Sequence, residues 1–200
     1  SGLTPFPSEH WAVLGPAMRT QARLHDELAG HQPRGPFKHF WGEAQRCVGD
    51  DQPFSLWLAL GVPFEVVGKL PREGHVFLSD FDARDLAARP PRRLPHLVCR
   101  TSASARPANA SAVGETLPEL FAFKHSLGKS LDAVPHVVED EPAVCAWYPT
   151  ARKALVWNLS EQPKTLTVAM PARAQQVRLG PLEATTLDFS AAWQHKPGNR

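Results

Sequence analysis

The segment Pro36–Leu86, PFKHFWGEAQRCVGDDQPFSLWLALGVPFEVVGKLPREGHVFLSDFDARDL, decides the predicted fold. Its short apolar runs are predicted to be β-strands: Phe37–Trp41, Phe64–Val67 and His75–Leu78. An apolar segment of helix length, Pro53–Leu60, lies between the first two runs, and Ser79 caps a second helix that follows the third run. Strands that alternate with helices are typical of βαβ units, so this segment predicts a parallel sheet.

The residues on either side extend this α/β unit. A helix is predicted from about Glu9 to Ala29, with a kink or break at Pro16. A fourth strand is predicted at Leu97–Arg100 and a last helix at Leu117–Leu127. The residues between them, Thr101–Gly114, are small and polar, which indicates a long surface loop. Right-handed crossovers favour the strand order 2-1-3-4.

The pattern changes after about residue 130. Strand-like runs then follow one another at close spacing: His136–Glu139, Ala143–Tyr148, Ala154–Leu159, Thr165–Ala169, Gln175–Leu179 and Ala184–Phe189. Turn residues, and no segment of helix length, separate them, which is typical of an antiparallel β-sandwich. The predicted fold class is therefore α/β plus β, with a lead-in helix in residues 1–32, the α/β domain in residues 33–130 and the sandwich in residues 131–200.

Composition excludes several classes of protein. The formal net charge of +2 gives no electrostatic case for binding nucleic acid or an anionic membrane. No apolar run approaches the roughly 18–20 residues of a membrane-spanning helix, so no membrane partner is expected. The cysteines, Cys47, Cys99 and Cys145, are few, odd in number and far apart, which favours a reducing compartment. The expected location is the cytoplasm, with a periplasmic or secreted location left open.

No strong catalytic signature is present. The sequence lacks the G-x-S-x-G nucleophile elbow, the G-x-G-x-x-G fingerprint and the Walker A loop. Cys99 lies at a strand end but without the glycines of a nucleophile elbow, and a buried strand cysteine is the favoured interpretation. We therefore predict no catalytic residue, no metal site and no cofactor.

Two aspartates that follow the third strand are candidate ligand-binding residues. Asp80 and Asp82 come directly after this strand, at the carboxyl end of the sheet, where open α/β sheets bind ligands. Carboxylates in that position could hold a metal or act as acid and base. The alternative, which we favour, is that Ser79 caps the helix and the aspartates stabilise its positive N-terminus.

Two tryptophans of the β domain are the other candidates. Trp147 and Trp157 lie on predicted strands, and aromatic rings on an exposed sheet face can stack against sugars. Such rings more often fill a core, which is the favoured interpretation here. Exposure of the rings to solvent would decide between these two roles.

Several stretches resemble the C-terminal portion of TIM-barrel glycoside hydrolases of the β-galactosidase type. They are HWAVLGPAMRTQARLHDELAG (residues 10–30), FSLWLALGVPFEVV (residues 54–67) and VFLSDFDARDLA (residues 76–87). The closing stretches ARKALVWNLSEQPKTLTVAM (residues 151–170) and LGPLEATTLDF (residues 179–189) are similar to the terminal sandwich domains of many glycosidases and amylase-like enzymes. The resemblance implies a flavodoxin-like, glutamine-amidotransferase-like α/β domain followed by a β-sandwich. In that family the catalytic glutamates sit on the barrel. A barrel needs roughly 250 residues and cannot be part of this chain, so no catalytic residue is carried over.

The resemblance implies a non-catalytic accessory region of a carbohydrate-active hydrolase, which frames an active site or promotes assembly. Its expected partners are carbohydrate, further copies of the chain, or the remainder of a longer parent chain. Two alternatives stay open. One is a carbohydrate-binding module that uses an exposed tryptophan, and the other is a small stand-alone hydrolase that uses Cys99 or the pair Asp80 and Asp82.

Overall fold

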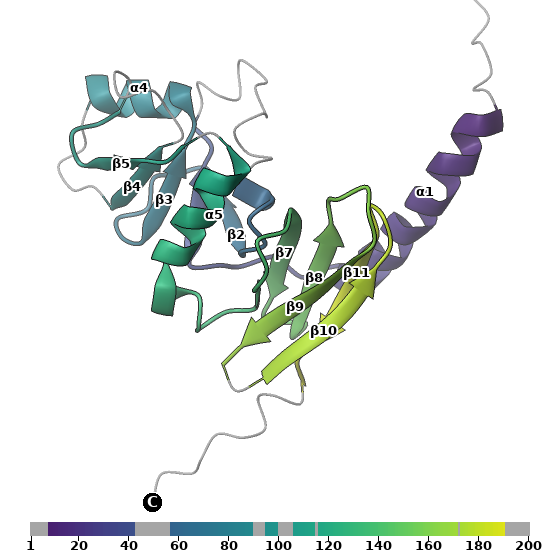
Figure 1. Ribbon diagram of the computed structural model, residues 1–200. Helices are drawn as coiled ribbons and strands as arrows, with labels where there is room; N and C mark the ends of the chain where they lie inside the picture. The colour runs from purple at the N-terminus through teal and green to yellow at the C-terminus, as the bar shows by residue number, and fades with distance from the viewer. Residues whose placement is uncertain are drawn as a thin grey trace, which may run out of the picture.

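The computed structural model describes residues 8–42, 57–89, 95–99, 106–114, 116–171 and 173–190, with the backbone alone for residues 8–17, 80 and 81. These residues form an α/β unit built on a parallel sheet and a second unit built from antiparallel sheets (Figure 1). The coarse fold class, α/β plus β, is as predicted. None of the helices in the described ranges is long and apolar enough to cross a membrane.

The parallel sheet has five strands in the order β2-β1-β3-β4-β5. Their bounds are Phe37–Phe40 for β1, Phe64–Val67 for β2, His75–Leu78 for β3, His96–Cys99 for β4 and Ala110–Ala112 for β5. The predicted order 2-1-3-4 is confirmed. The prediction of a loop over Thr101–Gly114 is wrong for its end, because β5 pairs there in parallel with β4. Three small residues carry no hydrophobic pattern, and the pairing with β4 alone makes them a strand.

Helices cover both faces of this sheet. Helix α4, Asp80–Ala88, places Ala83 and Leu86 against Val76 and Leu78 of β3. Helix α5, Leu117–Ser126, lies on the other face, where Leu120 and other apolar side chains join a core that contains Phe37, Phe77 and Trp57. Neighbouring residues of β3 thus point to opposite faces, as a strand buried on both sides requires. The first half of the predicted helix Pro53–Leu60 lies outside the described residues; Trp57 and Leu58 are helical, whereas Ala59 and Leu60 are not.

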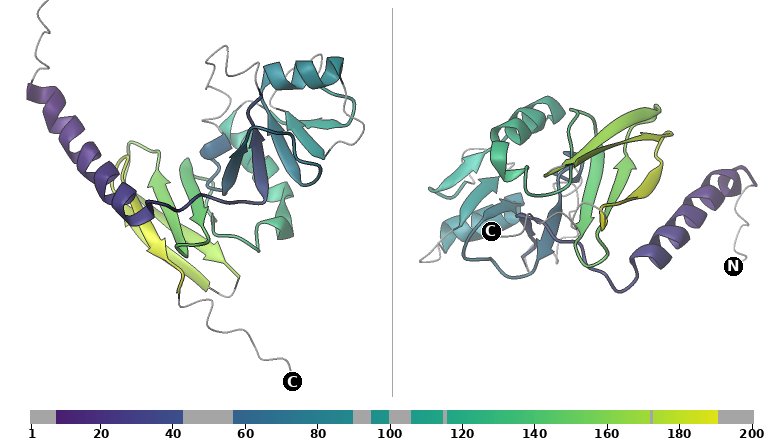
Figure 2. Two further views of the ribbon diagram at one scale, coloured as in Figure 1. Left: turned by 180° about the vertical axis from the view of Figure 1, so that it is seen from behind. Right: turned by 90° about the horizontal axis from the view of Figure 1, so that it is seen from below.

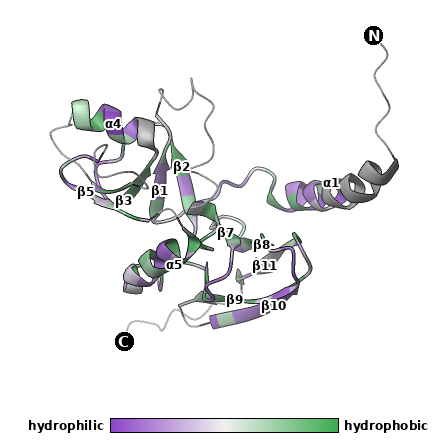
Figure 3. Cartoon of the chain, turned by 45° about the horizontal axis from the view of Figure 1, so that its top comes forward, coloured by the Kyte–Doolittle hydropathy of each residue, from purple (hydrophilic) through white to green (hydrophobic). Residues whose placement is uncertain are grey.

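The second unit contains two antiparallel sheets of three strands each, in the orders β10-β9-β6 and β11-β8-β7. Their bounds are His136–Val137 for β6, Ala143–Tyr148 for β7, Lys153–Asn158 for β8, Lys164–Met170 for β9, Arg173–Leu179 for β10 and Ala184–Asp188 for β11. All the predicted strands are therefore present. Side chains from both sheets, including Val156 and Val168, share one apolar core. In Figure 3 strand β10, at one edge, is coloured largely as hydrophilic.

A short segment around Gly61 joins the two units through the backbone. The N–H of Gly61 donates to the carbonyl of Ala143 at 2.8 Å, and the N–H of Val137 donates to the carbonyl of Gly61 at 2.8 Å. The N–H of Ala143 in turn donates to the carbonyl of Ala59 at 3.0 Å. Gly61 has a φ of +65°, a conformation that favours glycine. The junction is therefore continuous hydrogen-bonded structure rather than a loose linker.

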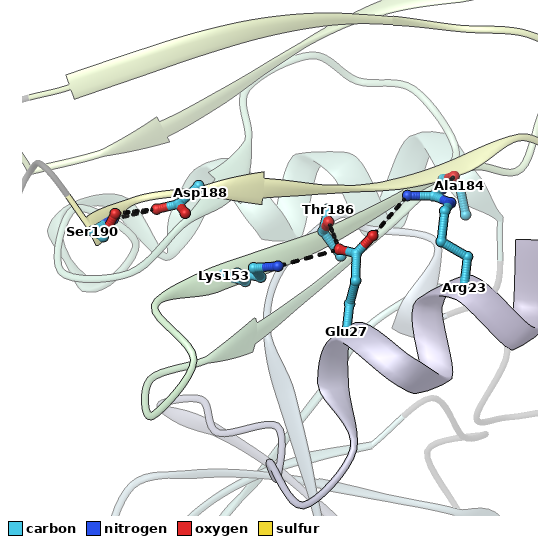
Figure 4. A network of polar contacts seen from close by, with 7 residues as sticks. All are labelled: Arg23, Glu27, Lys153, Ala184, Thr186, Asp188 and Ser190. Carbon is cyan, nitrogen blue, oxygen red and sulfur yellow. Dashed lines mark hydrogen bonds and ion pairs between the residues drawn. The ribbon is translucent and has the colours of Figure 1, made fainter.

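Helix α1, Ser8–Leu28, is anchored to the antiparallel unit and continues without a break across Pro16, where a kink or a break was predicted. Its last two turns contact the outer face of the β11-β8-β7 sheet (Figure 4). Glu27 accepts hydrogen bonds from the ammonium of Lys153 at 3.3 Å and from the hydroxyl of Thr186. Arg23 donates to the carbonyl of Ala184 at 3.3 Å. The rest of the helix extends beyond this sheet (Figure 2).

Candidate functional site

The order of the parallel strands defines where a ligand site is expected. Strand β1 lies beside β3, and the chain proceeds from β1 to β2 on one side and from β3 to β4 on the other. Open α/β sheets bind ligands at the carboxyl ends of the strands next to such a reversal. Phe40 and Leu78 are register partners at this end, so Gly42 and Ser79 follow the two strands at the same edge.

Asp82 lies at this edge, where it links the end of β1 to the start of α4. The hydroxyl of Ser79 donates to its carboxylate at 2.9 Å, and the N–H of Asp82 donates back to that hydroxyl at 3.2 Å. The backbone N–H of Gly42 donates to the same carboxylate. Ser79 therefore caps α4 as predicted, and Asp82 completes the cap.

The carboxylate of Asp82 is enclosed by this packing. Asp82 is only 3% exposed, and burial raises its pKa, against the lowering effect of the hydrogen bonds from Ser79 and Gly42. A Cβ atom on Gly42 would lie 2.1 Å from Oδ1 of Asp82, so the carboxylate lies directly against the backbone. Its oxygens serve internal hydrogen bonds and are not presented to solvent.

Among the described residues, the other groups that could take part in chemistry are buried or lie at the opposite end of the sheet, except for the exposed Asp85, whose charge raises the pKa of Asp82. The side chain of Asp80, the other predicted aspartate, lies outside the described residues. Cys99 is fully buried at the end of β4. His75 and His96 lie at the opposite, amino ends of their strands in an edge-to-face contact, with ring centroids 4.9 Å apart. Burial, followed by the charge of His96, lowers the pKa of His75.

His39 is the imidazole nearest to the carboxyl edge in the parallel sheet. It is fully buried on β1, and burial lowers its pKa to about 4, so the ring is neutral at pH 7. By strand alternation it shares the face of Phe37, the face that α5 covers, whereas α4 and Asp82 belong to the other face. The sheet therefore separates this imidazole from the carboxylate.

The two candidate tryptophans lie on opposite faces of one sheet. Trp147 is 6% exposed and packs edge-on against Phe189 in the core, with ring centroids 6.1 Å apart. Trp157 is 41% exposed on the outer face, and its Nε1 donates to the carbonyl of Leu182 at 3.0 Å. Trp157 alone of the two could stack against a ligand.

A buried lysine is the feature that the sequence prediction missed. Lys124 of α5 is 2% exposed, and its ammonium donates to the carbonyl of Glu139 at 2.8 Å. Burial lowers its pKa, and the carboxylates of Asp140 and Glu139 act in the opposite direction. It lines a pocket of about 220 Å³ with, among others, His125 and His136. The signal was present, because Lys124 follows Leu120 and Phe121 at the helical spacing of the buried face.

The lysine acts as a connection between the units. It ties α5 to the segment that follows β6, and cation–π geometry adds the ring of Phe121, whose centroid is 5.8 Å from Nζ. Among the described residues no group of three or more His, Cys, Asp or Glu side chains is placed to hold a metal ion. The contacts of Lys124 therefore hold the two units together and do not form a catalytic or metal-binding site.

Comparison with known proteins identifies no relative, since no family model, no curated protein and no solved structure matches the chain.

Proposed function

We propose that this chain is a non-catalytic accessory region of a carbohydrate-active glycoside hydrolase of the β-galactosidase type. Its work is to frame an active site that lies elsewhere or to hold copies of the enzyme together. The proposal begins from the resemblance of residues 10–30, 54–67 and 76–87 to that family, and of residues 151–170 and 179–189 to the terminal sandwich domains of glycosidases and amylase-like enzymes. Carbohydrate, and either further copies or the rest of a longer chain, are the proposed partners, and the cytoplasm is the proposed location.

One observation carries the non-catalytic part of the proposal. At the edge where a parallel sheet presents its catalytic groups, Asp82 is enclosed and hydrogen-bonded to Ser79 and Gly42. Cys99, the other candidate from the sequence, is fully buried. A general base or nucleophile must reach its substrate within hydrogen-bonding distance, which neither group can do in this arrangement.

The fold details of the proposal rest on the strand order. Five parallel strands in the order 2-1-3-4-5 match the flavodoxin-like arrangement, so we assign the α/β unit to that class. Two antiparallel sheets that share one core support the assignment of the second unit as a β-sandwich. The backbone junction at Gly61 suits a region whose task is to hold other parts in a fixed geometry.

The test is turnover together with assembly state. The purified chain is assayed against chromogenic β-glycosides and esters, and its mass in solution is measured by light scattering after size exclusion. The expected result is no turnover above that of a D82N variant, with a mass of two or more copies. Turnover that D82N or C99A abolishes would support the stand-alone hydrolase instead and overturn the proposal.

A second candidate function is favoured by one observation. Trp157 is exposed on a sheet face while its indole N–H is already hydrogen-bonded. An aromatic ring held in this way supports the alternative of a carbohydrate-binding module. The two candidates are compatible, because an accessory region can also hold the substrate of the enzyme to which it belongs.

A further inference from the structure

Trp157 and Leu182 form the one pair of large apolar side chains that are both exposed and joined by a hydrogen bond within the described residues. They are 41% and 57% exposed, and Nε1 of Trp157 donates to the carbonyl of Leu182 at 3.0 Å. Val144 and Ala184 are the register partners of Trp157 on the neighbouring strands, so its ring stands on the outer face of the sheet. We call this pair the Trp157–Leu182 surface.

The backbone beneath this surface is held in a single arrangement. The buried amide of Asn158 donates to the carbonyls of Gln162 at 2.9 Å and of Gly180 at 2.8 Å, which ties two turns together. Its Oδ1 accepts from the N–H of Ser160 at 2.9 Å. The carbonyl of Ser160 then accepts from the N–H of Leu182 at 3.1 Å. The backbone of both residues and the indole N–H of Trp157 are therefore held in place by hydrogen bonds within the chain.

Leu182 adopts a conformation that is costly for its residue type. Its φ is +53°, in the left-handed region that bulky residues rarely occupy. A glycine there would carry no such strain, yet the chain places an exposed leucine beside the exposed tryptophan. Strain of this kind concentrates at ligand-binding positions, where the surrounding structure maintains it.

The two turns at the rim of the surface are polar and acidic, and Arg23 of α1 lies at the carbonyl of Ala184, the register partner of Trp157. Glu161 and Gln162 on one turn and Glu183 on the other are exposed. The carboxylate of Glu183 accepts from the N–H of Gly180 at 2.6 Å, which holds it at the edge of the second turn. These oxygens can accept hydrogen bonds from hydroxyl groups, and their charge repels an anionic ligand.

We propose that the Trp157–Leu182 surface binds the face of a neutral pyranose sugar. The choice of a sugar rests on the proposed function, and the chemistry of the surface favours it. Because the indole N–H is occupied, the exposed part of the ring offers apolar contact rather than a hydrogen-bond donor, which suits the C–H groups on one side of a pyranose. The carboxylates and the amide of the rim suit hydroxyl groups at its edge. A protein partner would need a wider apolar patch than two side chains provide.

The test is binding of neutral polysaccharides to the full chain and its variants. Galactan, β-glucan and galactomannan serve as probes in affinity electrophoresis and calorimetry, with polygalacturonate as the anionic control. The expected result is binding of at least one neutral probe and none of polygalacturonate. W157A weakens that binding about tenfold or more, the effect typical of a truncated tryptophan anchor. W157F keeps most of it, and V66A, which shortens an exposed valine of the parallel sheet, leaves it unchanged.

The outcomes separate this inference from the proposed function. No binding of any neutral probe, or equal binding by W157A, overturns the inference and leaves the non-catalytic role standing. Self-association that W157A abolishes assigns the surface to a protein contact and also overturns it. Circular dichroism and thermal unfolding of each variant confirm that the fold is retained.

Discussion

A Cβ atom placed on Gly61 would lie 2.6 Å from the Cβ of Val137. Gly61 comes from the α/β unit and Val137 from β6 of the antiparallel unit, so this contact lies at the junction. The same two residues are joined by a backbone hydrogen bond of 2.8 Å. The backbones approach so closely here that no side chain fits between them.

Gly61→Ala therefore lowers the free energy of unfolding through two effects. The positive φ costs about 1–2 kcal/mol for a residue with a Cβ atom, and the clash with Val137 adds to this. Gly30→Ala is the matched control, because Gly30 has a φ of +77° with no atom within 4 Å of its added Cβ. Urea unfolding of both variants separates the two effects. Equal losses would show that the junction yields and that the close approach has no energetic consequence.

Asp82→Asn is expected to be milder than Asp82→Ala. The single amide oxygen of asparagine can still accept from one of the two donors, Ser79 or Gly42, whereas alanine leaves both without an acceptor at a cost of about 1–3 kcal/mol. The comparison is made by urea unfolding at pH 7. If asparagine and alanine are equally destabilising, the charge of the carboxylate and not its hydrogen bonds maintains the cap.

The buried carboxyl of Asp82 also gives stability a dependence on pH. Its pKa is raised from 3.8 in the folded chain, so between 3.8 and the raised value the folded state binds more protons than the unfolded state. The contribution of Asp82 to stability is therefore largest below pH 3.8 and falls as pH rises through the folded pKa. Unfolding measured across this window shows a steeper fall for the native chain than for D82N. Parallel curves would mean that Asp82 ionises in the folded chain as it does in the unfolded one.

Much of this fold follows from local patterns. The runs Phe64–Val67 and His75–Leu78 predicted two strands with their bounds. His75–Leu78 is buried on both faces and therefore reads as a continuous apolar run, whereas Phe64–Val67 is an edge strand on which Val66 is exposed. Strand β5 was missed because Ala110, Ser111 and Ala112 carry no such signal. Their strand conformation arises from pairing with β4, a long-range contact that the sequence pattern does not reveal.

The candidate site was harder to predict, as strand β8 illustrates. Alternation places Trp157 and Asn158 on opposite faces, and hydrophobicity alone would bury the tryptophan. The structure buries Asn158, because the carbonyls of Gln162 and Gly180 satisfy its amide. These partners lie on turns distant from one another in the sequence. Which face of a strand is buried thus depended on hydrogen bonds that only the folded chain brings together.

Glu27→Ala is expected to release α1 from the sheet. Glu27 holds Lys153 and Thr186 of the sheet, and its removal leaves Arg23 and a few apolar contacts to anchor the helix. Most of the stability of a helix in a protein comes from tertiary packing, so a helix that loses its contacts with the sheet frays more readily. Tryptic cleavage after Arg19 therefore becomes faster, whereas Asp26→Ala, a change at the exposed neighbour, leaves it unaltered. Equal rates for the native chain and E27A would contradict this role.

The same contact predicts a response to acid. The hydrogen bond from Thr186, with those from Lys153 and Arg23, lowers the pKa of Glu27 below 4.5. Such a group contributes stability that is fully present above pH 4.5 and is lost as pH falls through the lowered pKa. Hydrogen exchange of the backbone amides of the last two turns of α1 is therefore expected to accelerate below that pKa in the native chain. In E27A the exchange rate should show no such acceleration at that pH.

Lys124→Met tests the buried bond between α5 and the segment after β6. Methionine retains the apolar stem but leaves the carbonyls of Val138 and Glu139 without their donor, at a cost of about 1–3 kcal/mol at pH 7. Lys129→Met, at an exposed position in the helical turn Gly128–Ser130 that follows α5, is the control and is expected to be neutral. Chemical unfolding of both variants gives the comparison. A neutral K124M would mean that water reaches those carbonyls once the ammonium is gone.

The lowered pKa of Lys124 also predicts how the difference in stability between K124M and the native chain changes with pH. Burial lowers this pKa from 10.5, so between the lowered value and 10.5 the unfolded chain binds more protons than the folded one. The contribution of Lys124 to stability therefore rises with pH across that alkaline window, because the neutral amine is easier to bury than the ammonium. The difference in unfolding free energy between K124M and the native chain is expected to grow over the window. A difference that stays constant would show that the ammonium keeps its proton throughout.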